Sequence, residues 1–179
     1  KQTVANFLDL FQATHLVYRL KPFGYGKEVL RGRDKVYLAD GALPGAVLLL
    51  GRRLLEQPER LGAAVETAFF KHLFTRFYKD TPTFSYWRDR KNSDLEVDII
   101  ADLGDRLVPF EVKYQGTDVS ARKLKGMQLF LEQRKIDQGY VITQRWEDFG
   151  VSEMASKAGG ASARILKIPA PLACFWLSA

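Results

Sequence analysis

Two strand-like segments that meet at a glycine constrain this chain more than any other feature. Residues 96–102 and 106–114 are rich in strand-forming residues, and Gly104-Asp105 lies between them. A two-residue turn of this kind joins antiparallel strands in a fixed register. That register predicts three apolar pairs on one face of the hairpin, Val97 with Val112, Ile99 with Phe110 and Ala101 with Val108. We therefore expect one face of the hairpin to pack against the core.

The opposite face of the hairpin carries charge. Asp98 falls opposite Glu111 in the same register, with the two Cβ atoms roughly 5 Å apart, and Lys113 follows on the same side. Two carboxylates in such positions repel each other, and a hard divalent cation such as Mg²⁺ (or Mn²⁺) would resolve the conflict. The pattern predicts Asp98 and Glu111 as metal ligands, completed by the backbone carbonyl of Val112. Lys113 would then assist the attacking water or neutralise charge on phosphorus.

A simpler interpretation is that Lys113 neutralises Glu111, Glu96 and Asp98 in a surface ion network without a function. The agreement of the register favours the metal site. So does Glu66, which lies on a predicted helix over Leu61–Tyr78 and is a candidate auxiliary ligand.

The remaining segments predict two units that meet near Pro58. Residues 59–179 are expected to form an α/β domain, with further strands at 83–88, 139–143 and 163–168 and a helix at 118–135. Gly159-Gly160 is interpreted as a turn before the last strand. Residues 1–58 combine a helix over Thr3–Phe11, strands at 16–20 and 35–39, and a helix over 43–55, which suggests a small winged-helix-like segment.

Composition sets only broad limits. The formal net charge is +6 and the pI is about 9.4, which favours a polyanionic partner such as DNA. Arg88 is the best single candidate for a phosphate contact, within a basic set that could rim the site: Arg52, Arg53, Arg88, Arg90, Lys91, Arg122, Lys123 and Lys125. The single cysteine, Cys174, excludes an internal disulfide and favours a reducing cytoplasm. No apolar run is long enough to cross a membrane.

These residues resemble the PD-(D/E)XK superfamily, with Asp98 as the motif aspartate and Glu111-Val112-Lys113 as its E-x-K. The resemblance implies a restriction-endonuclease-like mixed sheet flanked by helices, and a metal contact from the helical Glu66. It also implies metal-dependent hydrolysis of phosphodiester bonds.

The whole chain is similar to the C-terminal region of uncharacterised bacterial and archaeal AAA-type ATPases. The likeness rests on residues 35–41, which resemble the linker signature, and on a site signature made by Tyr86-Trp87-Arg88, Glu96-Val97-Asp98 and Glu111-Val112-Lys113. It implies an N-terminal ATPase domain in the same polypeptide, and the chain begins without methionine inside a predicted helix, as expected of a fragment. A Walker-type G-x-x-x-x-G-K-[ST] motif is absent from the sequence, so ATP hydrolysis would lie outside it.

Three functions follow as hypotheses. The first is a magnesium-dependent nuclease acting on DNA. The second is a nuclease-like module that binds DNA or protein for the ATPase without catalysis, and the third is a protein-interaction domain that controls ATPase assembly.

Overall fold

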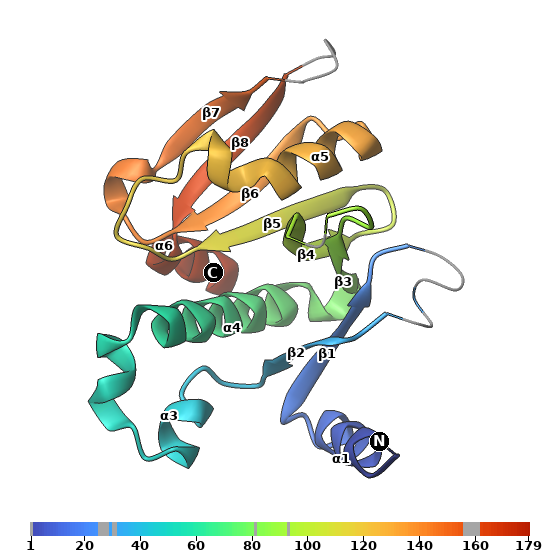
Figure 1. Ribbon diagram of the computed structural model, residues 1–179, viewed down its shortest axis with the longest axis vertical. Helices are drawn as coiled ribbons and strands as arrows, with labels where there is room; N and C mark the ends of the chain where they lie inside the picture. Colours follow the sequence, from blue (N-terminus) through green and yellow to red (C-terminus); the bar gives the residue numbers. More distant parts are fainter. Residues whose placement is uncertain (1, 25–28, 30–31, 81, 93, 156–161) are drawn as a thin grey trace.

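The protein forms a mixed β-sheet with helices packed on both faces (Figure 1). The computed structural model describes residues 2–24, 29, 32–80, 82–92, 94–155 and 162–179. Across these residues the sheet has eight strands in the order β2-β1-β3-β4-β5-β6-β8-β7. The expected α/β class with a mixed sheet and flanking helices is confirmed.

The elements have the following bounds. The strands are β1 (Val17–Pro22), β2 (Lys35–Leu38), β3 (Thr83–Arg88), β4 (Glu96–Asp102), β5 (Leu107–Lys113), β6 (Gln138–Thr143), β7 (Gly150–Met154) and β8 (Ala163–Pro169). The α-helices are α1 (Gln2–Ala13), α3 (Leu43–Val47), α4 (Pro58–Phe77), α5 (Lys125–Arg134) and α6 (Ala170–Ser178). Short 3₁₀ turns are η1 (Gly51–Glu56), η2 (Tyr78–Asp80), η3 (Ala121–Leu124) and η4 (Trp146–Asp148).

Two hydrophobic cores hold the layers together, one on each face of the sheet. On one face α4 packs beside α6, and Phe69, Phe70 and Leu73 of α4 are fully buried against the strands. On the other face α5 buries Met127 and Phe130. Burying a large apolar side chain contributes about 1.5–3 kcal/mol, so these faces supply most of the favourable packing energy.

A close approach fixes α5 against the strand that carries Asp98. Gly126 is the second residue of α5, and a Cβ atom at this position would lie 2.6 Å from the backbone nitrogen of Glu96. Only glycine allows the helix to sit this near to β4.

The central hairpin has the predicted turn and most of the predicted register. Leu103 N–H donates to Arg106 O at 3.0 Å, and Gly104 has φ +87°, as a tight Gly-Asp turn requires. Ile99 pairs with Phe110 and Ala101 with Val108.

The prediction for Val97 is wrong, because β4 contains an irregularity. Ser85 pairs with Ile100 but Trp87 pairs with Val97, so β4 takes one more residue than β3 over the same length. Such a bulge reverses the alternation of side chains. Val97 therefore packs with Ile100 on the α5 face, while Ile99 lies on the α4 face.

The N-terminal segment extends the main sheet. Its predicted helix and both predicted strands are present, and β1 pairs in parallel with β3 as well as antiparallel with β2. These pairings add β1 and β2 to one edge of the sheet, and a separate winged-helix unit is not confirmed. The division at residue 58 stays a prediction. The apolar stretch after Ala42 forms α3 and η1 instead of one helix.

The C-terminal part contains two elements that the sequence pattern did not indicate. Strand β7 pairs antiparallel with β8 at the sheet edge, and α6 follows β8 directly. The turn predicted at Gly159-Gly160 lies outside the described residues. None of the helices in the described residues combines the length and the hydrophobicity that a membrane-spanning helix needs.

Candidate functional site: a lysine-balanced acidic cluster

Three carboxylates and two lysines gather near the start of β4 and the end of β5, away from the hairpin turn. The central contact is made by Lys35 of β2, whose Nζ lies 2.7 Å from Glu66 Oε1 and 2.8 Å from Asp98 Oδ1. The ammonium thus bridges a carboxylate on helix α4 and a carboxylate on strand β4. We call Lys35, Glu66, Asp98, Glu111 and Lys113 the acidic cluster.

The second half of the acidic cluster is the predicted E-x-K pair. Lys113 Nζ lies 2.5 Å from Glu111 Oε1, and the other carboxylate oxygen of Glu111 accepts from Asp98 N–H at 3.4 Å. Asp98 Oδ2 in turn accepts from Val112 N–H at 2.9 Å. The two acidic strands are therefore cross-linked by their own motif side chains just beyond the backbone pair Ile99–Phe110 of the hairpin.

The structure brings the predicted residues together, with one change of detail. Asp98 and Glu111 are both buried, at 6% and 3% exposure, so neither belongs to a surface ion network. Val112 contributes its amide N–H to Asp98, and a metal contact through its carbonyl stays a prediction.

Sequence reasoning missed two members of the site, Lys35 and Tyr37. Tyr37 donates its hydroxyl to Glu66 Oε1 at 2.6 Å, and Lys35 is 63 residues from Asp98 in the chain. Both residues belong to the 35–41 segment, which carried only a family likeness. Their alternation on β2 puts them on one face of a strand, but which face meets Glu66 depends on the pairing of β2 with β1.

Burial and charge perturb the proton equilibria of the acidic cluster. Burial raises the pKa of Glu111 to about 8, and repulsion from Asp98 adds to the rise while Lys113 opposes it. Burial also raises the pKa of Glu66, again with Asp98 adding and Lys35 opposing. Burial lowers the pKa of Lys35, but attraction to Asp98 and Glu66 outweighs it, so the pKa of Lys35 is raised and its ammonium is firmly held. Within the acidic cluster the two lysines offset most of the negative charge of the three carboxylates.

The pKa of Lys113 is likewise set by two opposing effects, burial and a neighbouring carboxylate. Burial lowers the pKa of Lys113, and attraction to Glu111 more than compensates, so this pKa is raised as well. Lys113 therefore stays a cation and cannot act as a general base at neutral pH.

The predicted phosphate-binding residues lie on η1, at the end of β3, on the loop before β4, on η3 and at the start of α5. Arg88 donates to Glu96 Oε2 through Nε at 3.1 Å and Nη2 at 2.5 Å. Lys123 donates to Thr117 Oγ1 at 2.9 Å and to Asp118 O at 3.2 Å. Arg90 and Lys91 are exposed on the loop. Arg88 and Lys123 would have to give up these contacts to hold a phosphate.

The ligand atoms that Asp98 and Glu111 offer are all carboxylate oxygens, which is the type of ligand that a hard cation prefers. Among the described residues no three or more His, Cys, Asp or Glu side chains are arranged as a ready set of metal ligands. Magnesium is commonly held by one or two carboxylates together with water and substrate phosphate, so a two-carboxylate site remains chemically suitable. The lysine contacts on both carboxylates are what such an ion would have to displace.

The fold and this cluster together define an α/β domain whose mixed sheet carries buried, lysine-balanced carboxylates at one end. The family model described as "Domain of unknown function (DUF4143)" matches residues 61–159, more than half of the chain, and the chain belongs to that family. The matched region contains Glu66, Asp98, Glu111 and Lys113, whereas Lys35 and Tyr37 precede it. Neither the curated proteins nor the solved structures contain a match.

Proposed function

We propose that this chain is the restriction-endonuclease-like C-terminal part of an AAA-type ATPase, and that its acidic cluster hydrolyses phosphodiester bonds in DNA. The observation that carries the proposal is the meeting of Asp98 with the Glu111-x-Lys113 motif. Both carboxylates are buried, and the backbone N–H of one residue reaches the carboxylate of the other. Burying like charges side by side is costly, and a catalytic site is a physical reason to retain them.

Each residue has a separate role in this proposal. Asp98 and Glu111 would hold Mg²⁺ or Mn²⁺, with Glu66 as an auxiliary ligand. The bound ion supplies a water of lowered pKa and a Lewis acid for the phosphoryl oxygen. Lys113, held as an ammonium by Glu111, would stabilise negative charge that develops on the phosphate.

Lys35 occupies oxygen atoms that the proposed metal ion would need. Its ammonium contacts an oxygen of both Glu66 and Asp98, which are two of the three proposed ligands. The described arrangement is therefore that of a site balanced without metal, and turnover requires Lys35 to withdraw from Asp98. Its side chain is about a quarter exposed, so solvent is within reach when it does.

The test is cleavage of linear and supercoiled DNA by the full-length protein with Mg²⁺ or Mn²⁺. Asp98→Asn should abolish cleavage and leave the fold intact, because the amide keeps the shape and can still accept from Val112 N–H. Asp40→Asn is the matched control, since Asp40 also pairs with a lysine, Lys71 at 2.7 Å, but lies outside the cluster. Equal cleavage by the wild type and Asp98→Asn would refute the assignment.

A second function is favoured by the lysine contacts themselves. A scaffold that has lost catalysis would keep its buried carboxylates neutralised from within, as Lys35 and Lys113 do. In this second function the chain binds DNA or protein for the ATPase and does not hydrolyse DNA. DNA binding with a steep salt dependence, but no cleavage with either metal, would select this function.

A further inference from the structure

A cavity of about 790 Å³ lies at the other end of the hairpin from the acidic cluster. It opens beside the turn at Gly104, whereas Glu111 and Lys113 lie at the far end of β5. A strand of this length spans roughly 20 Å, so the turn and the E-x-K pair are well separated, and the cavity extends along β5 from the turn to Phe110. Its volume is within the range of about 300–1,000 Å³ that is typical of small-molecule pockets.

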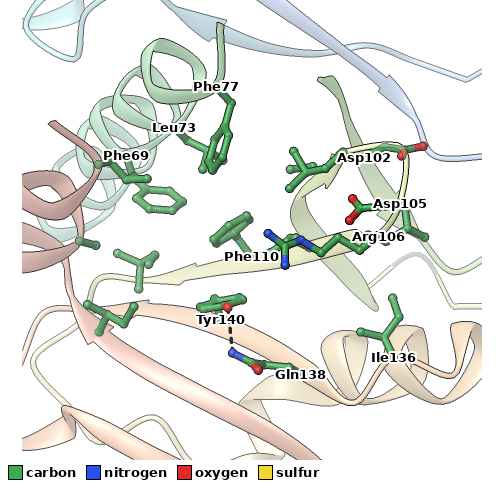
Figure 2. A pocket seen from close by; sticks show the side chains of 18 of the residues that line it. Phe69, Leu73, Phe77, Asp102, Asp105, Arg106, Phe110, Ile136, Gln138 and Tyr140 are labelled. Atoms are coloured by element: carbon green, nitrogen blue, oxygen red, sulfur yellow. Dashed lines mark hydrogen bonds between the residues drawn. The ribbon is translucent and has the colours of Figure 1, made fainter. Parts of the chain in front are cut away.

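The walls of the cavity are aromatic and aliphatic. Phe69, Leu73 and Phe77 point from α4 toward Phe110 and Tyr140 on the strands (Figure 2). The ring centroids of Phe69 and Phe110 are 5.5 Å apart, and those of Phe110 and Tyr140 are 5.2 Å apart in a stacked pair. An aromatic body of ligand size would extend this stack and remove apolar surface from water.

Two hydrogen-bond donors face this apolar space. The guanidinium of Arg106 extends from the hairpin toward Phe110 (Figure 2) and has no hydrogen bond or ion pair within the described part of the chain. Tyr140 Oη accepts from Gln138 Nε2 at 2.8 Å, which leaves its own O–H free to donate. A cationic donor and a hydroxyl donor beside apolar walls are complementary to a carboxylate that carries an apolar body.

The other charged groups at the rim are engaged or remain outside. Asp102 accepts from Gly104 N–H at 2.9 Å, Asp137 lies 4.0 Å from Arg164, and Arg134 stacks over the Phe23 ring at 4.9 Å. The exposed Asp105 stays nearer the turn and does not pair with Arg106 among the described residues (Figure 2). Among the described residues of the lining, Arg106 is thus the cationic side chain that no internal contact engages.

We propose that this cavity binds a small monocarboxylate with an aromatic or aliphatic body, its carboxylate held by Arg106 and the Tyr140 hydroxyl. The body stacks against Phe110 and fills the space below α4. The inference is independent of the proposed nuclease function, because none of these residues belongs to the acidic cluster.

The experiment is titration of the protein with 4-phenylbutyrate and with its uncharged analogue 4-phenyl-1-butanol, followed through backbone amide NMR shifts. We expect shifts centred on the cavity residues of β6 and the hairpin. A charge-assisted hydrogen bond that replaces water contacts should make the carboxylate bind about tenfold more tightly than the alcohol. Equal affinities, or shifts that centre elsewhere, would overturn the proposal.

Three variants separate the parts of the inference. Arg106→Leu should reduce the affinity for 4-phenylbutyrate to that of the alcohol, because only the charged contact is lost. Arg53→Leu, an exposed arginine on η1, is the matched control and should change nothing. Ala173→Phe places a ring in the cavity from α6 and should abolish binding of both compounds. Unchanged 4-phenylbutyrate binding by Arg106→Leu would contradict the proposal, as would failure of either compound to bind the wild type.

Discussion

Replacing Lys35 by methionine tests the central feature of the acidic cluster. Methionine keeps the length and apolar stem of lysine but removes the ammonium that bridges Glu66 and Asp98. Both ion pairs are mostly shielded from water, since the side-chain exposures are 8% for Asp98, 22% for Glu66 and 25% for Lys35. Breaking a fully buried ion pair costs about 3–5 kcal/mol, and partial exposure lowers the expected loss to about 2 kcal/mol at pH 7.

The loss should depend on pH in a direction set by the carboxylates. The pKa of Glu66 is already raised, and removing Lys35 takes away an interaction that opposed the rise. Glu66 then takes up a proton more readily in the folded variant, so the variant regains stability relative to the wild type as the pH falls toward 4. On the alkaline side the stabilising contact of Lys35, whose pKa is raised, persists up to about pH 10.5 and is lost as the pH rises further.

Metal should compensate for the missing ammonium. If Lys35→Met frees Asp98 for a divalent ion, then Mn²⁺ at ten times its Kd restores roughly 1.4 kcal/mol to the variant. Urea denaturation with and without Mn²⁺ measures both effects. Lys71→Met is the matched control, since the exposed Lys71–Asp40 pair should contribute under about 1 kcal/mol. If Lys35→Met loses no more stability than Lys71→Met, the reasoning is refuted.

Two further predictions concern stability. The pKa of Glu111 is raised from 4.5 to about 8, so ionising it in the fold costs stability progressively between those pH values. Glu111→Gln should therefore gain Tm relative to the wild type as the pH rises from 5 to 8, whereas the exposed control Glu153→Gln should show no such trend. A difference in Tm between Glu111→Gln and the wild type that stays constant over this pH range would contradict the raised pKa. Gly126→Ala places a Cβ 2.6 Å from Glu96 N and should lose about 1–3 kcal/mol in chemical denaturation, as overpacking does. Gly62→Ala, whose nearest neighbour would be 3.9 Å away, should instead be neutral or gain up to about 1 kcal/mol from helix propensity, and equal losses in both variants would argue against the close approach.

The sequence by itself determined the turn and most of the register of the central hairpin, and it brought the charged residues of the hairpin together. Alternating apolar residues and the Gly104-Asp105 turn fix pairing locally, so the pairs Ile99–Phe110 and Ala101–Val108 followed from chain geometry alone. The same geometry put Asp98 near Glu111, and helical periodicity put Glu66 on α4. Hairpins and helices are built from contacts close in sequence, and the local pattern therefore carries the information.

Only the tertiary structure decided which cations offset the charge of those carboxylates. Lys35 reaches Asp98 across 63 residues of chain, through the parallel pairing of β1 with β3 that brings the β2 edge over α4. The bulge that sends Val97 to the other face depends on β3, which is a separate strand. The cavity below α4 likewise needs α6, an element that the sequence pattern did not indicate. Such contacts join segments whose order in the sheet is set by the packing of whole layers, and no local periodicity encodes that order.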